Sequence, residues 1–337
     1  MGILRFLKSN SPILLALNVL LVLLTRLIFV VAPVDVDRLW LHHEPLAALT
    51  FSWLRPILPD AAFVAVGAVV SMLLSLMLNQ LVNENKVATK RTYLPGILFL
   101  VFAGFFNEFL IFSPAQIALY FLFRISSKVF RLTRPEKHLG DIFDTGLLSM
   151  LSTLFYFPSI VYVPLALIGI YTMRPFSFRD LWLVLSGFLT ALFCVFCYYY
   201  GQNRPGALVL AMLNFLNGHS FEFGMMQAMD IARLVWLGLL LLAAIVLVQG
   251  VLYSSSIQTR KYTGYITITS LAIIIGAVLA MRFDYSHLVL LTLPLGFLWS
   301  LLFVESRDSL FLDITFVVLF LSAPGLQWAA VLFIQKQ

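Results

Sequence analysis

The chain has 337 residues, of which 61% are hydrophobic and only 11% are charged, and its formal net charge is +6. Soluble domains are about 45–50% apolar and about 25% charged, so this composition excludes an ordinary soluble protein and indicates a membrane protein. No nucleic-acid partner is expected, because basic cytoplasmic loops of membrane proteins produce the same excess of positive charge. We expect residues 1–337 to form a single integral membrane domain.

Long apolar segments follow one another along the chain, separated by short polar breaks. A helix needs about 20 apolar residues to cross a bilayer, and it satisfies its own backbone hydrogen bonds in lipid. The sequence therefore predicts an all-α polytopic transmembrane protein of about eleven spans. The segments are residues 11–32, 61–83, 93–112, 114–131, 142–156, 159–173, 181–200, 231–253, 264–281, 287–304 and 309–334.

Proline punctuates two of these segments. Pro158 separates 142–156 from 159–173, which predicts a tight hairpin of short helices, because proline inside a helix ends or kinks it. The last segment is predicted to break at Pro324, so it either crosses once or re-enters. The N-terminal apolar run is longer than a signal-peptide core and no small-residue cleavage site follows it, so we expect a retained first span.

Basic residues concentrate in alternate polar breaks. The positive-inside rule places these breaks in the cytoplasm, with the N-terminus on the same side, and predicts a multi-pass inner-membrane protein. The residues concerned are Arg5, Lys8, Lys86, Lys90, Arg91, Arg124, Lys128, Arg131, Arg134, Lys137, Arg174, Arg179, Arg260, Lys261 and Arg307.

Two longer loops, residues 33–60 and 201–230, are expected on the opposite side, where their mixed composition is typical of interfacial amphipathic helices. The first loop holds Asp35, Asp37 and Glu44. Carboxylates just outside a membrane can bind a divalent cation or accept a proton from a hydroxyl group. All three are therefore candidate catalytic residues, and Asp35 and Asp37 are candidate ligands of a divalent metal ion. The alternative is an ordinary polar loop.

Two further ionisable residues lie within predicted spans. Glu108, beside Asn107, lies near the outer end of its span, where a carboxylate needs a partner or a watery cavity. The alternative is a helix-end side chain that extends to the interface. Arg26 lies toward the outer end of the first span, and three roles are open for it: pairing with Glu108, binding a phosphate, or extending to the interface.

Arginines on the outer side suggest a phosphate site. Arg204, Arg233 and Arg282 are candidate substrate-binding residues, because the guanidinium group matches phosphate oxygens in paired hydrogen bonds. His287 and Glu108 are expected to line the same cavity. The alternative for each arginine is anchoring at the interface or a local ion pair.

Other residues receive structural interpretations. Cys194 and Cys197 lie three apart inside an apolar segment, where small packing residues are a better interpretation than a redox pair. Asp141 is expected to cap the helix that follows it. His138 and Tyr156 are expected to lie in the aromatic belts at the interfaces.

Residues 93–200 include FNEFLIFSP, RISSKVFRL and IFDTGLLSMLSTLFYFPSIVYVP, and they resemble a family of uncharacterised polytopic inner-membrane proteins of Bacteroidota. The wider layout is similar to the GT-C superfamily of polyprenyl-phosphate-dependent glycosyltransferases. Those enzymes have interfacial helices and a catalytic acid in the first external loop, and a hairpin of short helices. The resemblance implies Asp35 or Asp37 as the catalytic acid and Gly146 at the start of the hairpin. The D-x-D spacing departs from the adjacent acidic pair commoner in that superfamily.

The sequence thus predicts a GT-C-like glycosyltransferase that moves a sugar from a polyprenyl-phosphate donor on the periplasmic face. Membrane lipids and a polyprenyl-phosphate-linked sugar are its expected partners. No nucleotide-binding glycine loop or zinc-protease motif is present. The first alternative is a non-catalytic subunit that scaffolds a secretion, motility or envelope-assembly complex with other envelope membrane proteins. The second is a lipid or solute transporter, which ranks lower because the acids cluster at the outer edge.

Overall fold

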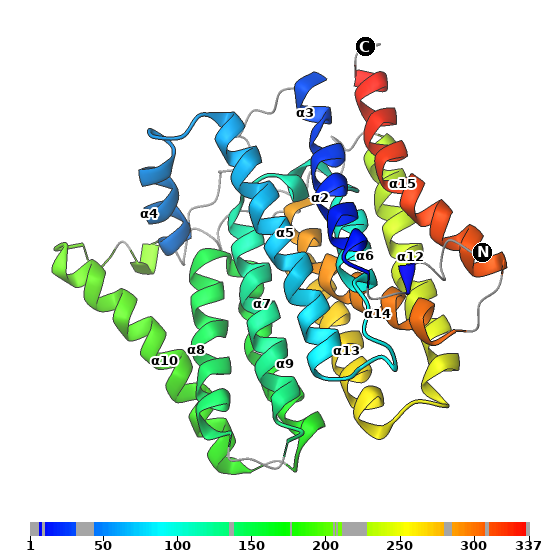
Figure 1. Cartoon of the computed structure of the whole chain (residues 1–337). Coiled ribbons are helices and arrows are strands. Elements are labelled where there is room, and N and C mark those ends of the chain that lie inside the picture. The colour runs from blue at the N-terminus through cyan, green and yellow to red at the C-terminus, as the bar shows by residue number, and fades with distance from the viewer. Residues whose placement is uncertain are drawn as a thin grey trace.

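Long apolar helices that run between two ends of the molecule make up most of the computed structural model (Figure 1). The structure describes residues 7–8, 11–31, 44–134, 138–175, 177–204, 206, 208–210, 228–279, 285–306 and 310–334. Every regular element within these residues is helical, which confirms the all-α prediction for them.

The helices follow the predicted apolar segments closely. The predicted segment 114–131 coincides with helix α7 at both ends. The elements are α2 (Ile13–Arg26), α3 (Ile28–Val31), α4 (Pro45–Leu54), α5 (Asp60–Glu84), α6 (Leu94–Ala103), η2 (Asn107–Leu110), α7 (Pro114–Arg131), α8 (Leu139–Phe155), η3 (Phe157–Val161), α9 (Tyr162–Met173), α10 (Phe178–Gly201), α12 (Ala228–Leu252), α13 (Ile257–Leu279), η5 (Tyr285–Leu291), α14 (Thr292–Glu305) and α15 (Leu310–Ile334).

Six helical stretches within the described residues are long and apolar enough to cross a membrane. Shorter apolar helices lie beside them, so the number of crossings, put at eleven from the sequence, stays a prediction. Within the stretch Tyr285–Glu305, residues 286–304 are all buried by other parts of the chain, which makes it the centre of the bundle. The six stretches are Ile13–Val30, Asp60–Glu84, Phe178–Gly201, Ile231–Leu252, Ile257–Val278 and Tyr285–Glu305.

One of the helix breaks predicted from the sequence is present in the structure, and the structure differs from the prediction at two other places. α8 ends at Phe155 and η3 contains Pro158, so the predicted hairpin break is confirmed. The predicted span 93–112 is divided, because α6 ends at Ala103 and the short helix η2 begins at Asn107. The prediction of a break at Pro324 is wrong, since α15 continues through it. Proline removes one backbone donor, and membrane helices tolerate that loss where neighbouring helices support them.

Two glycines allow α8 and α10 to pack backbone against backbone. A Cβ atom on Gly146 would lie 2.0 Å from the carbonyl oxygen of Val184, and one on Gly187 would lie 2.1 Å from that of Phe143. Both distances are far below van der Waals contact. Small residues at such crossings are typical of helix pairs in membranes, where close packing replaces the hydrophobic effect.

The face that α10 turns toward α8 explains where its cysteines lie. The buried residues Val184, Gly187 and Ala191 recur every three or four positions along one side of the helix. Cys194 and Cys197 lie off this stripe and are exposed. Their interpretation as packing residues is therefore wrong, because one apolar helix offers both a packed face and an outward face.

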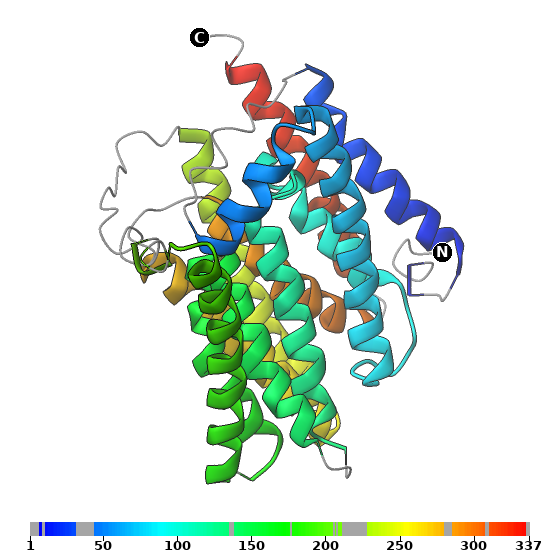
Figure 2. The ribbon, with the colours of Figure 1, turned by 90° about the vertical axis from the view of Figure 1, so that its left-hand side faces the viewer.

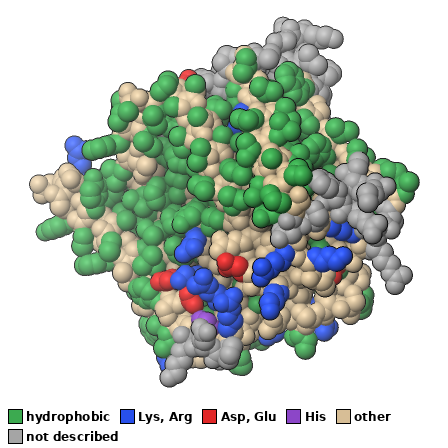
Figure 3. All heavy atoms as spheres, viewed as in Figure 1, with side chains coloured by type: hydrophobic (Ala, Val, Ile, Leu, Met, Phe, Trp, Pro, Cys, Tyr) green, Lys and Arg blue, Asp and Glu red, His purple; other side chains and the backbone are tan. Residues whose placement is uncertain are grey.

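Hydrogen bonds between distant loops gather the basic breaks at one end of the bundle, called the basic end below. They run from Lys8 Nζ to the Ser306 carbonyl (3.0 Å), from Thr92 to the Leu7 carbonyl (3.0 Å), from Thr259 to the Val87 carbonyl (3.2 Å) and from Lys261 Nζ to the Met173 carbonyl (3.1 Å). Figure 3 shows Lys and Arg side chains gathered below a broad hydrophobic surface. The opposite end carries α4, which the turned view in Figure 2 also shows, and the break between α8 and α9, where the Phe157 N–H bonds Glu44 just before α4.

A buried arginine ties three segments together near the opposite end. Arg26 Nη2 donates to the carbonyls of Gly67 (3.0 Å) and Leu110 (3.2 Å) and to the Ser71 hydroxyl (2.8 Å). The side chain belongs to α2, and its partners belong to α5 and η2. The sequence left three roles open for Arg26: pairing with Glu108, binding a phosphate, or extending to the interface. In the structure its guanidinium instead cross-links backbone segments of α5 and η2.

We expect Arg26→Met to destabilise the protein by about 3 kcal/mol, because two buried carbonyl groups lose a charged donor. The measurement is the thermal unfolding of the purified protein in detergent. Arg260→Met, at an exposed position, is the matched control. Equal unfolding temperatures for the two variants would contradict the role assigned to Arg26.

Candidate functional site

An imidazole and a phenol meet where α8 ends and η5 begins. The Tyr156 hydroxyl and His287 Nδ1 share a hydrogen bond, and the Ser286 hydroxyl lies 3.4 Å from the same phenol oxygen. All three side chains are buried, with exposures of 4% or less. Tyr156 reaches this position because α8 stops at the residue before it and the backbone becomes extended. Its assignment to an interfacial belt is therefore wrong.

A carboxylate lies beside this group. Glu44 Oε1 accepts a hydrogen bond from the backbone N–H of Phe157, the residue after Tyr156, at 3.3 Å. Glu44 directly precedes α4, whose first residue is Pro45, and it is 5% exposed. The Tyr199 hydroxyl donates to the Pro45 carbonyl at 3.0 Å and so anchors the start of α4 to α10. Burying a carboxylate costs free energy unless polar groups bind it, so the hydrogen bond from Phe157 is needed to hold Glu44 in this position.

A guanidinium group is linked to the short helix of the histidine through two aromatic rings. Arg233, on α12, is 5% exposed and lies over the ring of Phe106, with Cζ 5.7 Å from the ring centre. Phe106 stacks on Tyr285 with ring centres 5.2 Å apart. Tyr285 and His287 belong to the same short helix, η5. The cation–π contact holds the guanidinium against an aromatic wall next to the histidine.

Amide side chains extend the polar group toward η2 and α15. Gln327 Nε2 donates to Asn107 Oδ1 at 3.4 Å, and Gln116 Nε2 donates to the Phe109 carbonyl at 2.7 Å. Glu108, next to Asn107, is half-buried in η2. The divided segment after α6 therefore presents an amide and a carboxylate in place of a continuous helix surface.

The structure brings several of the predicted site residues to one end of the bundle. Glu44, Arg233 and His287 are connected by the contacts above, and Glu108 lies in η2, two residues from Phe106. Arg204 is exposed at the end of α10 and its backbone N–H bonds the Tyr199 carbonyl (3.0 Å). Asp35, Asp37 and Arg282 lie outside the described residues, and so does the metal site predicted on the two aspartates.

Sequence reasoning missed Tyr156, Phe106 and Gln327. A usable signal existed for Tyr156, because a polar aromatic residue just before the break at Pro158 turns away from the helix that it ends. Gln327 also carried a signal, because a polar amide inside an apolar segment needs a partner. Phe106 lies in an apolar run, and the sequence does not distinguish it from lipid-facing neighbours. No group of three or more His, Cys, Asp or Glu side chains in the described part of the chain has the arrangement of a metal site.

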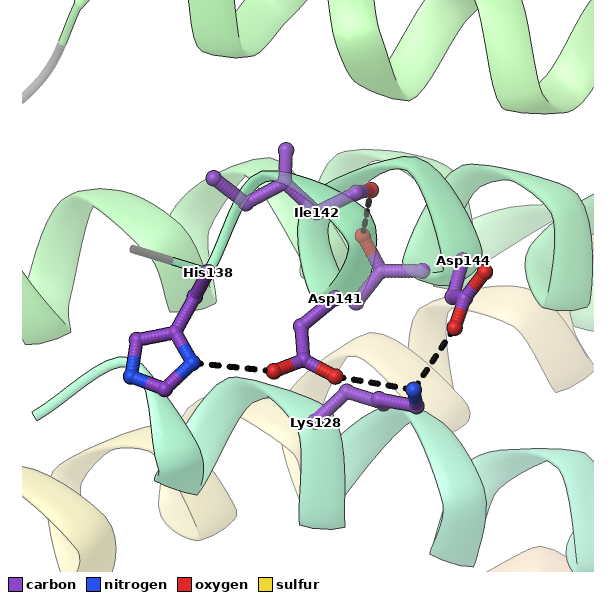
Figure 4. Close-up of polar contacts among 6 residues, drawn as sticks. Lys128, His138, Asp141, Ile142 and Asp144 are labelled. Carbon is purple, nitrogen blue, oxygen red and sulfur yellow. Dashed lines mark hydrogen bonds and ion pairs between the residues drawn. The ribbon is translucent and has the colours of Figure 1, made fainter. Parts of the chain in front are cut away.

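A second polar cluster lies at the basic end (Figure 4). Lys128 Nζ lies between Asp141 (2.8 Å) and Asp144 (2.6 Å), and His138 Nδ1 lies 3.0 Å from Asp141. His138 precedes α8 and is 7% exposed, so its assignment to an interfacial belt is wrong. Asp141 is the third residue of α8 and not its cap, because Lys128 and His138 engage its carboxylate. The cluster joins α7 to α8.

The Asp141 carboxyl makes this junction sensitive to pH. Burial opposes its ionisation, but its hydrogen bonds to Lys128 and His138 outweigh burial, so its pKa lies below the ordinary value. Its contribution to stability is therefore complete above about pH 4 and is lost as the pH falls through the lowered pKa. We expect the unfolding temperature of Asp141→Asn to fall less between neutral and acidic pH than that of the unaltered protein. Parallel curves would contradict the assignment.

Comparison of the chain with protein-family models, with curated proteins and with solved structures finds no match. The fold defines an all-helical protein with six helices, among the residues described, that are apolar and long enough to cross a membrane. The buried polar group at the end opposite the basic loops is the strongest functional feature of the described residues.

Proposed function

We propose that the chain is a multi-pass inner-membrane glycosyltransferase of GT-C-like layout, with about eleven spans and its basic end in the cytoplasm. It transfers a sugar from a polyprenyl-phosphate donor at the periplasmic end. The observation that carries the proposal is a set of contacts linked through neighbouring residues of the chain. Glu44 accepts from the backbone of Phe157, the residue after Tyr156, and Tyr156 bonds His287. Arg233 lies over Phe106, which stacks on Tyr285, two residues before His287. This set gathers a carboxylate, an imidazole and a guanidinium inside an apolar bundle.

This set of groups suits a lipid-linked phosphate. A polyprenyl chain needs an apolar path, and its phosphate needs cations held in a desolvated place. Arg233 provides such a cation, because it is buried and its guanidinium rests on Phe106. Arg282 is the second candidate for a cation that binds the phosphate. In the sequence it precedes Leu288, a residue of η5, by six positions. Pairing with the donor phosphate would also stabilise the negative charge that develops on the leaving group.

The transfer step is a substitution at the anomeric carbon of the sugar. The acceptor hydroxyl oxygen forms the new bond to that carbon while the bond from carbon to the phosphate oxygen breaks. Polyprenyl phosphate leaves with the bonding electron pair. Asp37 or Asp35 takes the proton of the acceptor hydroxyl, and Glu44, in the same loop, is the carboxylate that faces the described part of the site. His287 and Glu108 orient the sugar.

The test is transfer of label from a polyprenyl-phosphate sugar by proteoliposomes that contain the full chain. The variant with alanine at both Asp35 and Asp37 should lose activity by a factor of about 100 or more, because a general base is worth that much. Arg233→Gln should weaken donor binding, whereas Arg260→Gln, at the basic end, should not. Full activity of the double variant would overturn the assignment. If a membrane protein copurifies in stoichiometric amount and the variant without Asp35 and Asp37 keeps its function, the alternative of a non-catalytic scaffolding subunit is favoured.

A further inference from the structure

The outward face of α7 carries cations at helical spacing. Arg124, Lys128 and Arg131 are four and three residues apart, so they lie on one side of the helix, and Arg134 follows the helix end. The three arginines are exposed. Asp141 and Asp144 both pair with Lys128, so four cations face two carboxylates and positive charge is in excess. This set is called the α7 cation ladder below.

Arg124 lies far from the end of its helix. It comes seven residues before Arg131, which corresponds to about 10 Å along the helix axis. Among the described residues no carboxylate forms an ion pair with it, since the ion pairs of this region all involve Lys128 or Asp141. An exposed guanidinium at this depth is costly beside hydrocarbon unless an anion accompanies it.

The same face of α7 becomes apolar one turn further from the basic end. Tyr120 is 43% exposed, and Ile117 and Phe121 are half-buried. The Phe121 ring contacts those of Tyr120 (5.7 Å) and of Phe155 on α8 (6.1 Å). The distance from Ile117 to Arg131 along the helix is about 21 Å. One continuous surface therefore passes from aromatic to cationic over the length of a lipid molecule.

We propose that this face binds an anionic phospholipid. The headgroup phosphate lies between Arg124 and Arg131, and an acyl chain follows Ile117, Tyr120 and Phe121 toward the middle of the bilayer. The apolar strip favours a lipid over an acidic protein segment. An acyl chain can contact this strip within the hydrocarbon, whereas an acidic peptide would stay in the water. The site lies on the half of α7 nearer the basic end, whereas the proposed transferase site includes Tyr156, just beyond the other end of α8.

The test measures binding of fluorescent phosphatidylglycerol to the purified full chain in detergent, with phosphatidylcholine as the reference lipid. The variant R124Q/R131Q should bind phosphatidylglycerol roughly thirtyfold more weakly, because each cation near a lipid headgroup strengthens binding by a factor of about five. The control R179Q/R260Q removes the same charge from exposed positions at the same end. It should bind the lipid like the unaltered protein.

Three outcomes would overturn the proposal. Equal loss in both double variants would mean that the whole basic end attracts anions without a defined site. Equal affinity for the two lipids would mean that charge is not recognised. An acidic peptide that displaces phosphatidylglycerol at lower concentration than free lipid would identify a protein partner instead. The variant R124K/R131K should retain most of the binding, which separates loss of charge from loss of fold.

Discussion

Replacing Gly187 with alanine is expected to destabilise the protein by about 3 kcal/mol, since overpacking of this kind typically costs that much. The added methyl group would lie 2.1 Å from the carbonyl oxygen of Phe143 and 2.9 Å from the backbone nitrogen of Leu147. Both contacts are backbone atoms, so no side-chain rotation relieves them, and α8 and α10 must separate. The measurement is thermal unfolding in detergent, and Gly146→Ala should behave alike.

Gly238→Ala is the matched control for this prediction. Gly238 lies within α12, and a Cβ atom there would meet nothing within 4 Å. Alanine favours helix over glycine by about 1 kcal/mol, so this variant should unfold at the same temperature or slightly higher. If Gly187→Ala and Gly238→Ala have the same unfolding temperature, α8 and α10 do not approach as closely as the structure shows.

The second large effect is expected at His287. If the proposed transfer takes place at this end, His287→Ala should lower its rate by a factor of about 100, because a misplaced sugar can lose that much of the rate. Tyr156→Phe should lower the rate less, because the imidazole stays but loses the phenol that fixes its orientation. It should also displace the pH profile of the reaction, which a purely structural residue would not do.

Tyr162→Phe is the control for the tyrosine variant. Tyr162 is fully buried and its hydroxyl has no hydrogen-bond partner in the described structure. Removing this hydroxyl should leave both the rate and the pH profile unchanged, and stability unchanged or higher, because an unsatisfied buried group is lost. Equal activity of Tyr156→Phe and Tyr162→Phe would show that the bond to His287 has no part in the reaction.

Much of the fold could be predicted because membrane helices are specified locally. The apolar run of α7 begins at Pro114 and ends among basic residues, and both boundaries follow from composition. The break at Pro158 was equally predictable, because proline ends or kinks a helix, and α8 ends at Phe155. The break predicted at Pro324 was wrong, since whether a helix bends or continues at proline depends on what its neighbours supply.

The site was only partly predictable, for a different reason. Glu44, Arg233 and His287 were identified because ionisable residues are scarce in this chain and each needs an explanation. Tyr156 and Phe106 were not, because aromatic residues are abundant and only tertiary packing separates buried ones from lipid-facing ones. The partners of Arg26 are mostly backbone carbonyls, which no sequence pattern reveals.

The most direct measurement is photo-crosslinking of the full chain with polyprenyl phosphate that carries a photoreactive group beside its phosphate. Attachment sites are mapped by mass spectrometry, with excess phosphatidylglycerol present to occupy the α7 cation ladder. We expect crosslinks to residues 106–108, 156–157, 233 and 285–287, and their loss when unlabelled polyprenyl phosphate competes. Crosslinks spread over the outward faces of α10 and α12, with none at these positions, would contradict a lipid-phosphate site at the end opposite the basic loops.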